Sequence, residues 1–320
     1  MLFRSITPEG YLNDSIVAIG LSRKCFRVGV ATIDNLKDLT LIAITHAVHA
    51  ARAALVRKVG AIDSRRCFAI VFVDGTVGCE EKLAAALGTE LAGIPLVGGS
   101  AGDDWTAKST PDSLRAYVLH DGRFRRNSAV LLLVQTDVPW RTMTHNHYRA
   151  TKSKAVITSA RPDRRLVCEI NGHPATPTYA SLCGMSGQPR AGYDFSAHPA
   201  MIRIGGKWFP RGILKLHRDH SIQFACAIER GLVVAVGEPE DMVQKLEAAL
   251  GEIRAQIGQP ALILGFDCAA RMVDMDRNGL RGRISLIHKQ NNVVGLSTLG
   301  EQYNTMHMNN SFTALAIGRG

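Results

Sequence analysis

The sequence is poor in aromatic side chains and lacks any concentrated basic segment. Phe, Trp and Tyr make up 6% of the 320 residues, which leaves few rings for stacking on nucleic-acid bases. The net charge is +10, but the basic residues fall in short, separated clusters rather than in one helix or tail. A solvated basic surface explains this charge, so we expect no nucleic-acid partner.

Paired-cysteine motifs and long apolar runs are also missing. The seven cysteines are an odd number and never form the Cys-x-x-Cys spacing of zinc sites and redox motifs. Most lie in apolar stretches, which is typical of buried thiols in a reducing compartment. The most apolar run, residues 129–134, is far shorter than the roughly 20 residues of a membrane span. The first five residues turn polar too early for a signal peptide. We therefore expect a cytoplasmic protein with no membrane partner.

The order of apolar segments predicts an α/β fold. A buried strand at 68–73, a helical pattern at 80–91 and a glycine-rich strand follow one another, and residues 201–236 resemble an antiparallel meander. No regular pattern is visible between Pro139 and Leu166. We predict a mixed α+β protein of two related mixed-sheet domains with helices packed on the sheets. The glycine-rich stretch 184–192 is the best linker, which divides the chain into residues 1–183 and 184–320.

Two glycine-rich turns look like copies of each other. The first is IPLVGGSAGDDW at residues 94–105, and the second is NVVGLSTLGEQ at residues 292–302. In each, a short apolar strand runs into Gly-x-Ser, then a further glycine and then an acid. Glycines let backbone N–H groups converge, and the Ser and the acid add polar groups at a strand end. This pattern predicts ligand pockets in two related half-domains.

The candidate ligand-binding residues follow from these turns. They are Gly98, Ser100 and Asp103 in the first, and Gly295, Ser297, Glu301, Gln302, Asn304 and His307 in and after the second. The polar side chains of the second turn can bind an amino or guanidino group, and Arg203 or Arg211 can take a carboxylate. Asp103, Asp104 and Glu301 can also be interpreted as acid/base groups, but turn acids more simply accept backbone N–H bonds. His145 and His147 have metal-like spacing without a third ligand, which favours a solvated strand face.

A serine hydrolase is the alternative function. Residues 98–102 fit the Gly-x-Ser-x-Gly nucleophile elbow, with Ser100 as the nucleophile. That elbow requires a helix directly after the serine, whereas the residues that follow indicate a loop. No triad histidine can be assigned from spacing. We therefore favour a protein that is not an enzyme.

The chain resembles the FIST family of bacterial sensory proteins, which have an N-terminal and a C-terminal FIST domain. The resemblance rests on the first turn (94–105), on RRLVCEINGHPATPTY (164–179), on HPAMIRIGGKWFPRGI (198–213) and on GLSTLGEQYNTMHMNNSF (295–312). It covers nearly the whole chain. Residues 6–22 look like the family stretch that follows an earlier Gly-x-Ser-Thr-x-Gly-Glu turn, so we expect a shortened N-terminal domain or a misplaced start.

The tail of the sequence most resembles the family branch of haem-binding nitric-oxide sensors. The resemblance implies a sensor that binds a small ligand or haem b, mainly in its C-terminal domain. It also implies a signalling partner, either a histidine kinase or a diguanylate cyclase or phosphodiesterase. His198 and His307 lie in the two matching motifs and are the candidate haem ligands. Since the sequence has no Cys-x-x-Cys-His, any haem would bind non-covalently.

Overall fold

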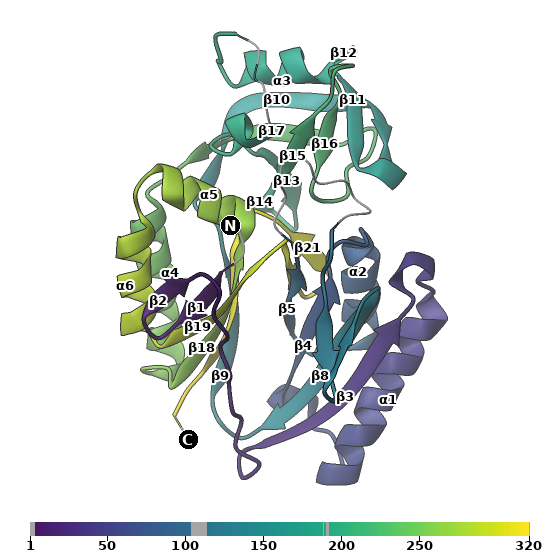
Figure 1. The fold of residues 1–320 in the computed structure, drawn as a ribbon, viewed down its shortest axis with the longest axis vertical. Helices are drawn as coiled ribbons and strands as arrows, with labels where there is room; N and C mark the ends of the chain where they lie inside the picture. Colours follow the sequence, from purple (N-terminus) through teal and green to yellow (C-terminus); the bar gives the residue numbers. More distant parts are fainter. Residues whose placement is uncertain (1–3, 104–113, 188, 190–191, 320) are drawn as a thin grey trace.

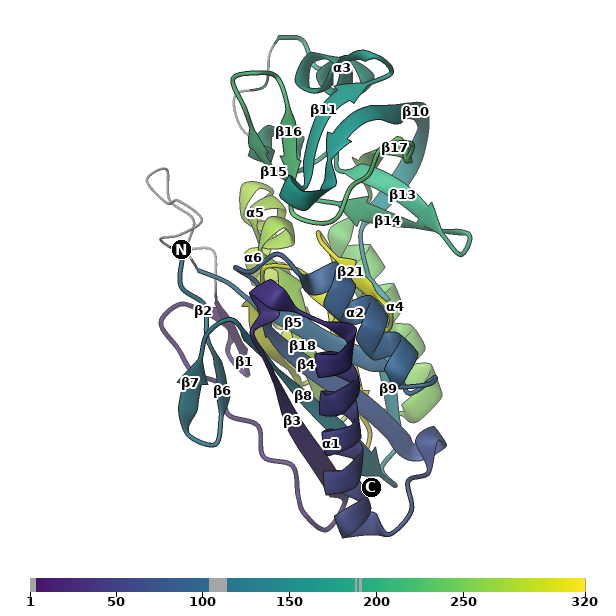
Figure 2. The same ribbon diagram turned by 90° about the vertical axis from the view of Figure 1, so that its right-hand side faces the viewer.

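The computed structural model describes residues 4–103, 114–187, 189 and 192–319 (Figure 1). Within these residues the chain forms three large sheets and one separate small hairpin, β6 (Val118–His120) with β7 (Arg123–Arg125). Two of the large sheets, called sheet I and sheet II, form the body. The third, called the cap sheet, lies across one end of the body (Figure 2).

Sheet I is built mainly from the first 136 residues, with one hairpin added from the end of the chain. Its order is β21 (Met306–Met308), β20 (Glu301–Tyr303), β5 (Leu96–Ala101), β4 (Cys67–Asp74), β8 (Ser128–Thr136) and β3 (Phe26–Asp34). Its outer face carries α1 (Leu41–Val59) and α2 (Glu80–Glu90), and α2 connects the parallel strands β4 and β5. Helix α1 begins where the Thr40 side chain accepts the Ala43 N–H, and it ends at Gly60, whose φ is 76°.

Sheet II repeats this arrangement around three strands of the second half of the chain, with β1, β2 and β9 added from the first half. Its order is β2 (Gly10–Leu12), β1 (Ser5–Thr7), β19 (Val293–Thr298), β18 (Leu262–Cys268), β22 (Phe312–Ile317) and β9 (Trp140–His145). Its outer face carries α4 (Met242–Ile257), α5 (Ala269–Arg277) and α6 (Arg281–Gln290). As in sheet I, two parallel strands are followed by two antiparallel neighbours. The predicted α/β fold with two related halves and helices packed on the sheets is confirmed.

The two sheets face each other, so the body has four layers: helices, sheet, sheet, helices (Figure 1). Their inner faces share one apolar core that includes Phe68, Val97, Phe266 and Leu315. Gly99 lies at a close approach of the two sheets. A Cβ there would stand 2.4 Å from Thr298 Cγ2 and 2.7 Å from the Phe266 ring. This glycine therefore sets how tightly sheet I packs on sheet II.

The cap sheet draws its strands from both sides of the predicted boundary at residues 183 and 184. Its order is β14 (Lys207–Arg211), β13 (Ala200–Ile204), β17 (Val233–Pro239), β10 (Tyr148–Arg161), β11 (Leu166–Ile170), β16 (Ile222–Phe224) and β15 (Ile213–Leu216), with β12 (His173–Pro174) on β11. Helix α3 (Ala175–Leu182) packs on it through Tyr179. The reading of residues 139–166 as irregular is wrong, because β9 and the long strand β10 lie there. Polar residues on the exposed parts of β10 hide its alternation.

The sheets are also tied together by hairpins that leave their own half. The hairpin β20–β21 follows β19 of sheet II, yet β20 pairs antiparallel with β5 of sheet I, with Glu301 opposite Gly99 and Gln302 opposite Gly98. At the other end of the chain, β1 pairs with β19, so Ser5 lies opposite Leu296. The two halves therefore share backbone hydrogen bonds as well as an apolar core.

The close approach at Gly99 can be tested by adding one methyl group. We expect Gly99→Ala to lower the free energy of unfolding by about 1–3 kcal/mol, because the new Cβ must push apart two closely packed sheets. The matched control is Gly20→Ala, since a Cβ at Gly20 meets nothing within 4 Å, and it should change stability by less than about 0.5 kcal/mol. Denaturant unfolding measures both, and equal stabilities would contradict this account of the sheet contact.

Candidate functional site

The two glycine-rich turns, almost 200 residues apart in sequence, touch each other. The Ser100 N–H donates to the Gly300 carbonyl and the Leu299 N–H donates to the Ser100 carbonyl, each at 2.9 Å. Both turns follow the carboxyl ends of parallel strands, and the cap covers this end of the body (Figure 2). We call this region, where residues 299–311 run between the body and the cap, the junction. The two turns therefore form one region.

The glycine that opens each Gly-x-Ser motif serves the packing of strands. A Cβ on Gly98 would stand 2.1 Å from the carbonyl oxygen of Val71, its partner in β4. A Cβ on Gly295 would stand 1.9 Å from the carbonyl oxygen of Gly265, its partner in β18. The same glycine role thus recurs in both halves. It explains the repeat without a direct contact from either glycine to a ligand.

Glu301 is fully buried between two hydroxyl groups. The Ser311 hydroxyl lies 2.5 Å from one of its carboxyl oxygens, and the Thr298 hydroxyl hydrogen-bonds the other. Burial raises the pKa of Glu301 well above its ordinary value, which favours the protonated form. A neutral carboxyl can donate to one hydroxyl while it accepts from the other. In this conformation, Glu301 fastens the turn to the start of β22.

The side chains of three more predicted residues also hydrogen-bond other groups of the protein. Ser297 Oγ accepts the Arg4 N–H at 3.0 Å, and Asn304 Oδ1 accepts the Leu96 N–H at 3.2 Å. Asp103 Oδ2 accepts the Arg115 N–H at 2.9 Å. Its neighbour Asp104 lies outside the described residues. These contacts hold the turns in shape.

The segment from Gln302 to Asn310 differs, because it keeps buried polar atoms without a partner. These atoms are Gln302 Oε1, His307 Nε2, Asn309 Oδ1 and Asn310 Oδ1. All four residues are at most 2% exposed. A buried polar atom left unsatisfied costs about 1–3 kcal/mol, so such atoms normally meet water or a ligand. Their gathering in one segment marks the junction as the candidate site.

Charged residues from α2 and the cap surround this segment. Arg165 Nη2 lies 2.6 Å from a carboxyl oxygen of Glu80 and 2.6 Å from one of Glu81, and both acids open α2. Arg211 Nη1 donates to the His307 carbonyl at 3.1 Å, while its Nε has no partner. Burial lowers the pKa of His307, against the opposing effect of the two acids, which favours a neutral ring. The site thus combines neutral polar groups with charges of both signs.

A second buried cluster lies on the sheet II side of the junction. Arg271 is fully buried, and its Nη1 contacts both carboxyl oxygens of Asp267, at 2.9 and 2.8 Å. Tyr11, from the N-terminal hairpin, hydrogen-bonds the same carboxylate. The Arg271 guanidinium lies 5.8 Å from the centre of the Phe312 ring. Its Nε and Nη2 remain without partners.

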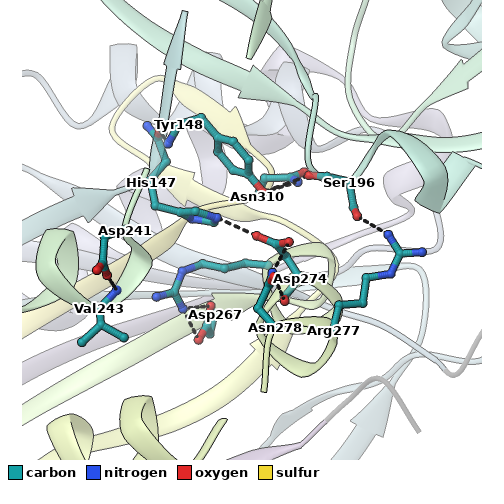
Figure 3. Close-up of polar contacts among 12 residues, drawn as sticks. His147, Tyr148, Ser196, Asp241, Val243, Asp267, Asp274, Arg277, Asn278 and Asn310 are labelled. Carbon is teal, nitrogen blue, oxygen red and sulfur yellow. Dashed lines mark hydrogen bonds and ion pairs between the residues drawn. The ribbon is translucent and has the colours of Figure 1, made fainter. Parts of the chain in front are cut away.

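Two histidines and Asn310 complete this second cluster. Figure 3 shows the His147 ring pointing at Asp274, with 2.7 Å between Nε2 and the carboxyl oxygen, and the Tyr148 hydroxyl beside Asn310 at 3.4 Å. His147 Nδ1 and His145 Nε2 have no partner. Burial lowers the pKa of His145 to about 3. The expected solvated face for these histidines is wrong, since both are buried. Asn310 contacts Tyr148 here and ends the unpartnered segment, so it links the two clusters.

Two of the predicted residues lie elsewhere. Arg203 is exposed in the cap, and its Nε donates to the Gly206 carbonyl within the β13–β14 hairpin. His198 is partly buried in the cap, where its Nδ1 lies 3.2 Å from the Gly237 carbonyl. Conversely, sequence reasoning gave no role to Glu80, Glu81 and Arg165. Two acids at the start of a helix are common, and no sequence signal distinguished this pair.

The surroundings of His307 do not fit haem in this conformation. Its Nδ1 lies 3.2 Å from Gln302 Nε2, and its Nε2 faces Gly300, where a Cβ would stand only 2.8 Å from it. Charged side chains lie around the ring, whereas haem needs an apolar slot beside the ligating nitrogen. Among the described residues, no three His, Cys, Asp or Glu side chains group as a metal site.

The hydrolase alternative finds no support. Ser100 is fully buried, and its hydroxyl accepts a hydrogen bond from Gln302 Nε2 at 2.9 Å. Within the described part of the chain, no histidine hydrogen-bonds this hydroxyl. Strand β5 continues to Ala101 and Gly102 is irregular, so the helix that the elbow requires does not begin at the serine.

The fold and the site define a class of α/β protein in which a buried polar site lies at the carboxyl ends of parallel strands. Comparison with known families gives the particular one. The chain matches the FIST N domain over residues 3–173 and the FIST C domain over residues 175–304. It belongs to the FIST family, whose domains are sensory domains in signal transduction. No curated protein shows a significant match to it. None of the helices in the described residues is long and apolar enough to cross a membrane.

The buried Glu301 carboxyl predicts a specific pH dependence. An unfolded glutamate ionises near pH 4.3, so between that pH and its higher folded-state pKa the folded protein binds the extra proton. Stability due to Glu301 therefore falls as the pH rises. Glu301→Gln cannot ionise, and its stability relative to the unchanged protein should grow as the pH rises from 5 to 8.

Urea unfolding at both pH values measures this difference. The exposed Glu247→Gln is the matched control and should follow the unchanged protein at both. A constant gap between Glu301→Gln and the unchanged protein would show that Glu301 does not bind the proton in the folded state.

Proposed function

We propose that this protein is a non-enzymatic sensor that binds a small polar ligand at the junction and reports its binding to a signalling partner. One observation carries the proposal: unpartnered buried polar atoms gather along residues 302–310 and on the side chains that face them. Membership of a sensory family supports the same function. The site lies at the carboxyl ends of parallel strands, where open α/β sheets bind ligands.

The chemistry of these atoms favours a small zwitterion such as an amino acid. The side-chain amides of Gln302, Asn309 and Asn310 offer oxygen acceptors for an amino group. The guanidinium groups of Arg211 and Arg271 retain N–H donors for a carboxylate. An uncharged ligand overall also suits a site whose acids and arginines already pair with each other.

The same placement supplies a means of signalling. Arg211 comes from the cap, whereas Gln302 and His307 come from the hairpin bound to sheet I. A ligand that contacts both stabilises one arrangement of the cap on the body over others. It can therefore bias a partner through differential affinity for two states. A histidine kinase, or a diguanylate cyclase or phosphodiesterase, is the partner that the family resemblance implies.

Haem b is the second candidate ligand. The unpartnered Nε2 of His307 favours it, because that atom is the one through which histidine ligates iron. Binding would require Gly300 to move away from the ring. This requirement makes the small polar ligand the leading candidate.

A ligand screen tests the proposal. We expect at least one of the twenty amino acids to raise the thermal midpoint of the unchanged protein, since a ligand stabilises the state that it binds. His307→Gln should weaken that ligand about tenfold, as the loss of one buried hydrogen bond to a charged group predicts. The exposed Thr305→Ala, on the same hairpin, is the matched control and should bind normally.

Haem enters the same experiment through its absorption spectrum. If a Soret band forms with added haem, shifts with nitric oxide and is lost in His307→Gln, the ligand is haem and not an amino acid. If no amino acid raises the midpoint and no Soret band forms, the proposed function is wrong.

A further inference from the structure

The cap carries a hollow of about 540 Å³ that shares one residue, Arg211, with the site proposed above. We call it the cap hollow. Strands β10, β13, β14 and β17 supply most of its lining, and they lie side by side in the cap sheet (Figure 2). Its volume falls in the range of sites for small molecules, about 300–1,000 Å³.

Three cations line the cap hollow without an ion-pair partner. They are Lys154, Arg203 and Arg211, and none of them lies within 4 Å of a carboxylate oxygen in the part of the chain that the structure describes. The single acid in the lining is the exposed Glu229. The cap hollow therefore has an excess of positive charge, which suits an anion.

Arg211 shows that this is more than an exposed basic surface. The residue is 9% exposed, and its Nε has no hydrogen-bond partner. A guanidinium held in place by burial offers N–H donors in a fixed plane, which matches a carboxylate. The two exposed cations, Lys154 and Arg203, can add attraction at the mouth.

The remaining lining is apolar. Trp208 contributes a partly exposed ring, Ile202 is a buried side chain, and Ile204 and Val233 are exposed hydrophobic side chains, at 39% and 52%. A ring or short apolar body would cover these side chains and stack on the tryptophan. The ligand should therefore carry both a carboxylate and an apolar part.

We infer that the cap hollow binds a small carboxylate with an aromatic or apolar body, and that Arg211 couples this binding to the junction. Among the residues that the structure describes, Arg211 is the only lining residue that hydrogen-bonds the junction, from its Nη1 to the His307 carbonyl at 3.1 Å. A carboxylate bound by Arg211 either competes with the His307 carbonyl for the guanidinium or fixes the orientation of that guanidinium. Binding in the cap hollow thus changes the restraint on residues 302–310. The coupling rests on the proposed function, whereas the binding does not.

Benzoate is the probe for binding, and benzamide is its neutral match. We expect benzoate to move the indole N–H signal of Trp208 in the NMR spectrum of the full chain, with Trp208→Phe giving the assignment. Benzamide should bind at least tenfold more weakly, because it lacks the charge. An equal affinity for both probes, or a Trp208 signal that stays in place up to the solubility limit of benzoate, would overturn the assignment.

Variants separate the roles of the cations. Arg203→Gln is at an exposed position and should weaken benzoate about threefold to tenfold without a change in fold. Arg211→Gln should remove binding. Lys215→Gln is the matched control, since Lys215 is an exposed cation of the cap outside this lining. Unchanged affinity in Arg203→Gln and Arg211→Gln would place benzoate elsewhere.

Hydrogen exchange tests the coupling. In the unchanged protein benzoate should alter exchange in peptides that cover residues 302–310 as well as in the strands that line the cap hollow. If benzoate binds but changes exchange only in β10, β13, β14 and β17, the coupling is wrong and the binding site stands. Neither result depends on whether an amino acid binds at the junction, so the two proposals fail separately.

Discussion

The pairing of β20 with β5 is the interaction on which the rest of the structure depends. It places the hairpin that follows β19 on the edge of sheet I, and so it fixes the second glycine-rich turn against the first. The Gln302 side chain then reaches Ser100, and residues 302–310 are drawn between the body and the cap. A backbone ladder positions these groups more firmly than side-chain contacts alone, since each bond supports its neighbours.

Local patterns in the sequence predicted the elements far better than their assembly. The strand at 68–73 and the helix at 80–91 have clear periodicity, and the structure contains them. The strands predicted within residues 201–236 also form, but their predicted meander order is wrong, because β13 pairs with both β14 and β17 while β15 pairs with β16. Strand β10 was not predicted, because polar residues on its exposed parts break the alternation on which strand prediction relies. The exchange of hairpins between sheets has no local signal at all, because β20 is a three-residue strand that could pair with any free edge.

The site was predicted in part, for a similar reason. Gln302 and His307 follow a recognisable turn, and both retain unpartnered polar atoms. Glu301 follows the same turn, yet its carboxyl hydrogen-bonds the hydroxyls of Thr298 and Ser311. A buried carboxyl needs such partners, because burial without hydrogen bonds is costly. The glycines suggested a ligand cradle, whereas Gly98 and Gly295 serve close strand packing. Arg165 comes from the cap and contacts Glu80 of α2. The local spacing of a motif cannot predict a contact between residues that are far apart in the sequence.

The cap sheet also limits how the chain can be divided into independent parts. The family models divide the chain between residues 173 and 175, and that division falls inside the cap, between β12 and α3. Strands β10 and β11 belong to the first part, and β13 to β17 belong to the second, yet they form one sheet. If recombination joined either part to an unrelated domain, half of the cap sheet would be left with unpaired edges. The two parts therefore form one structural unit, since neither can complete the cap sheet without the other.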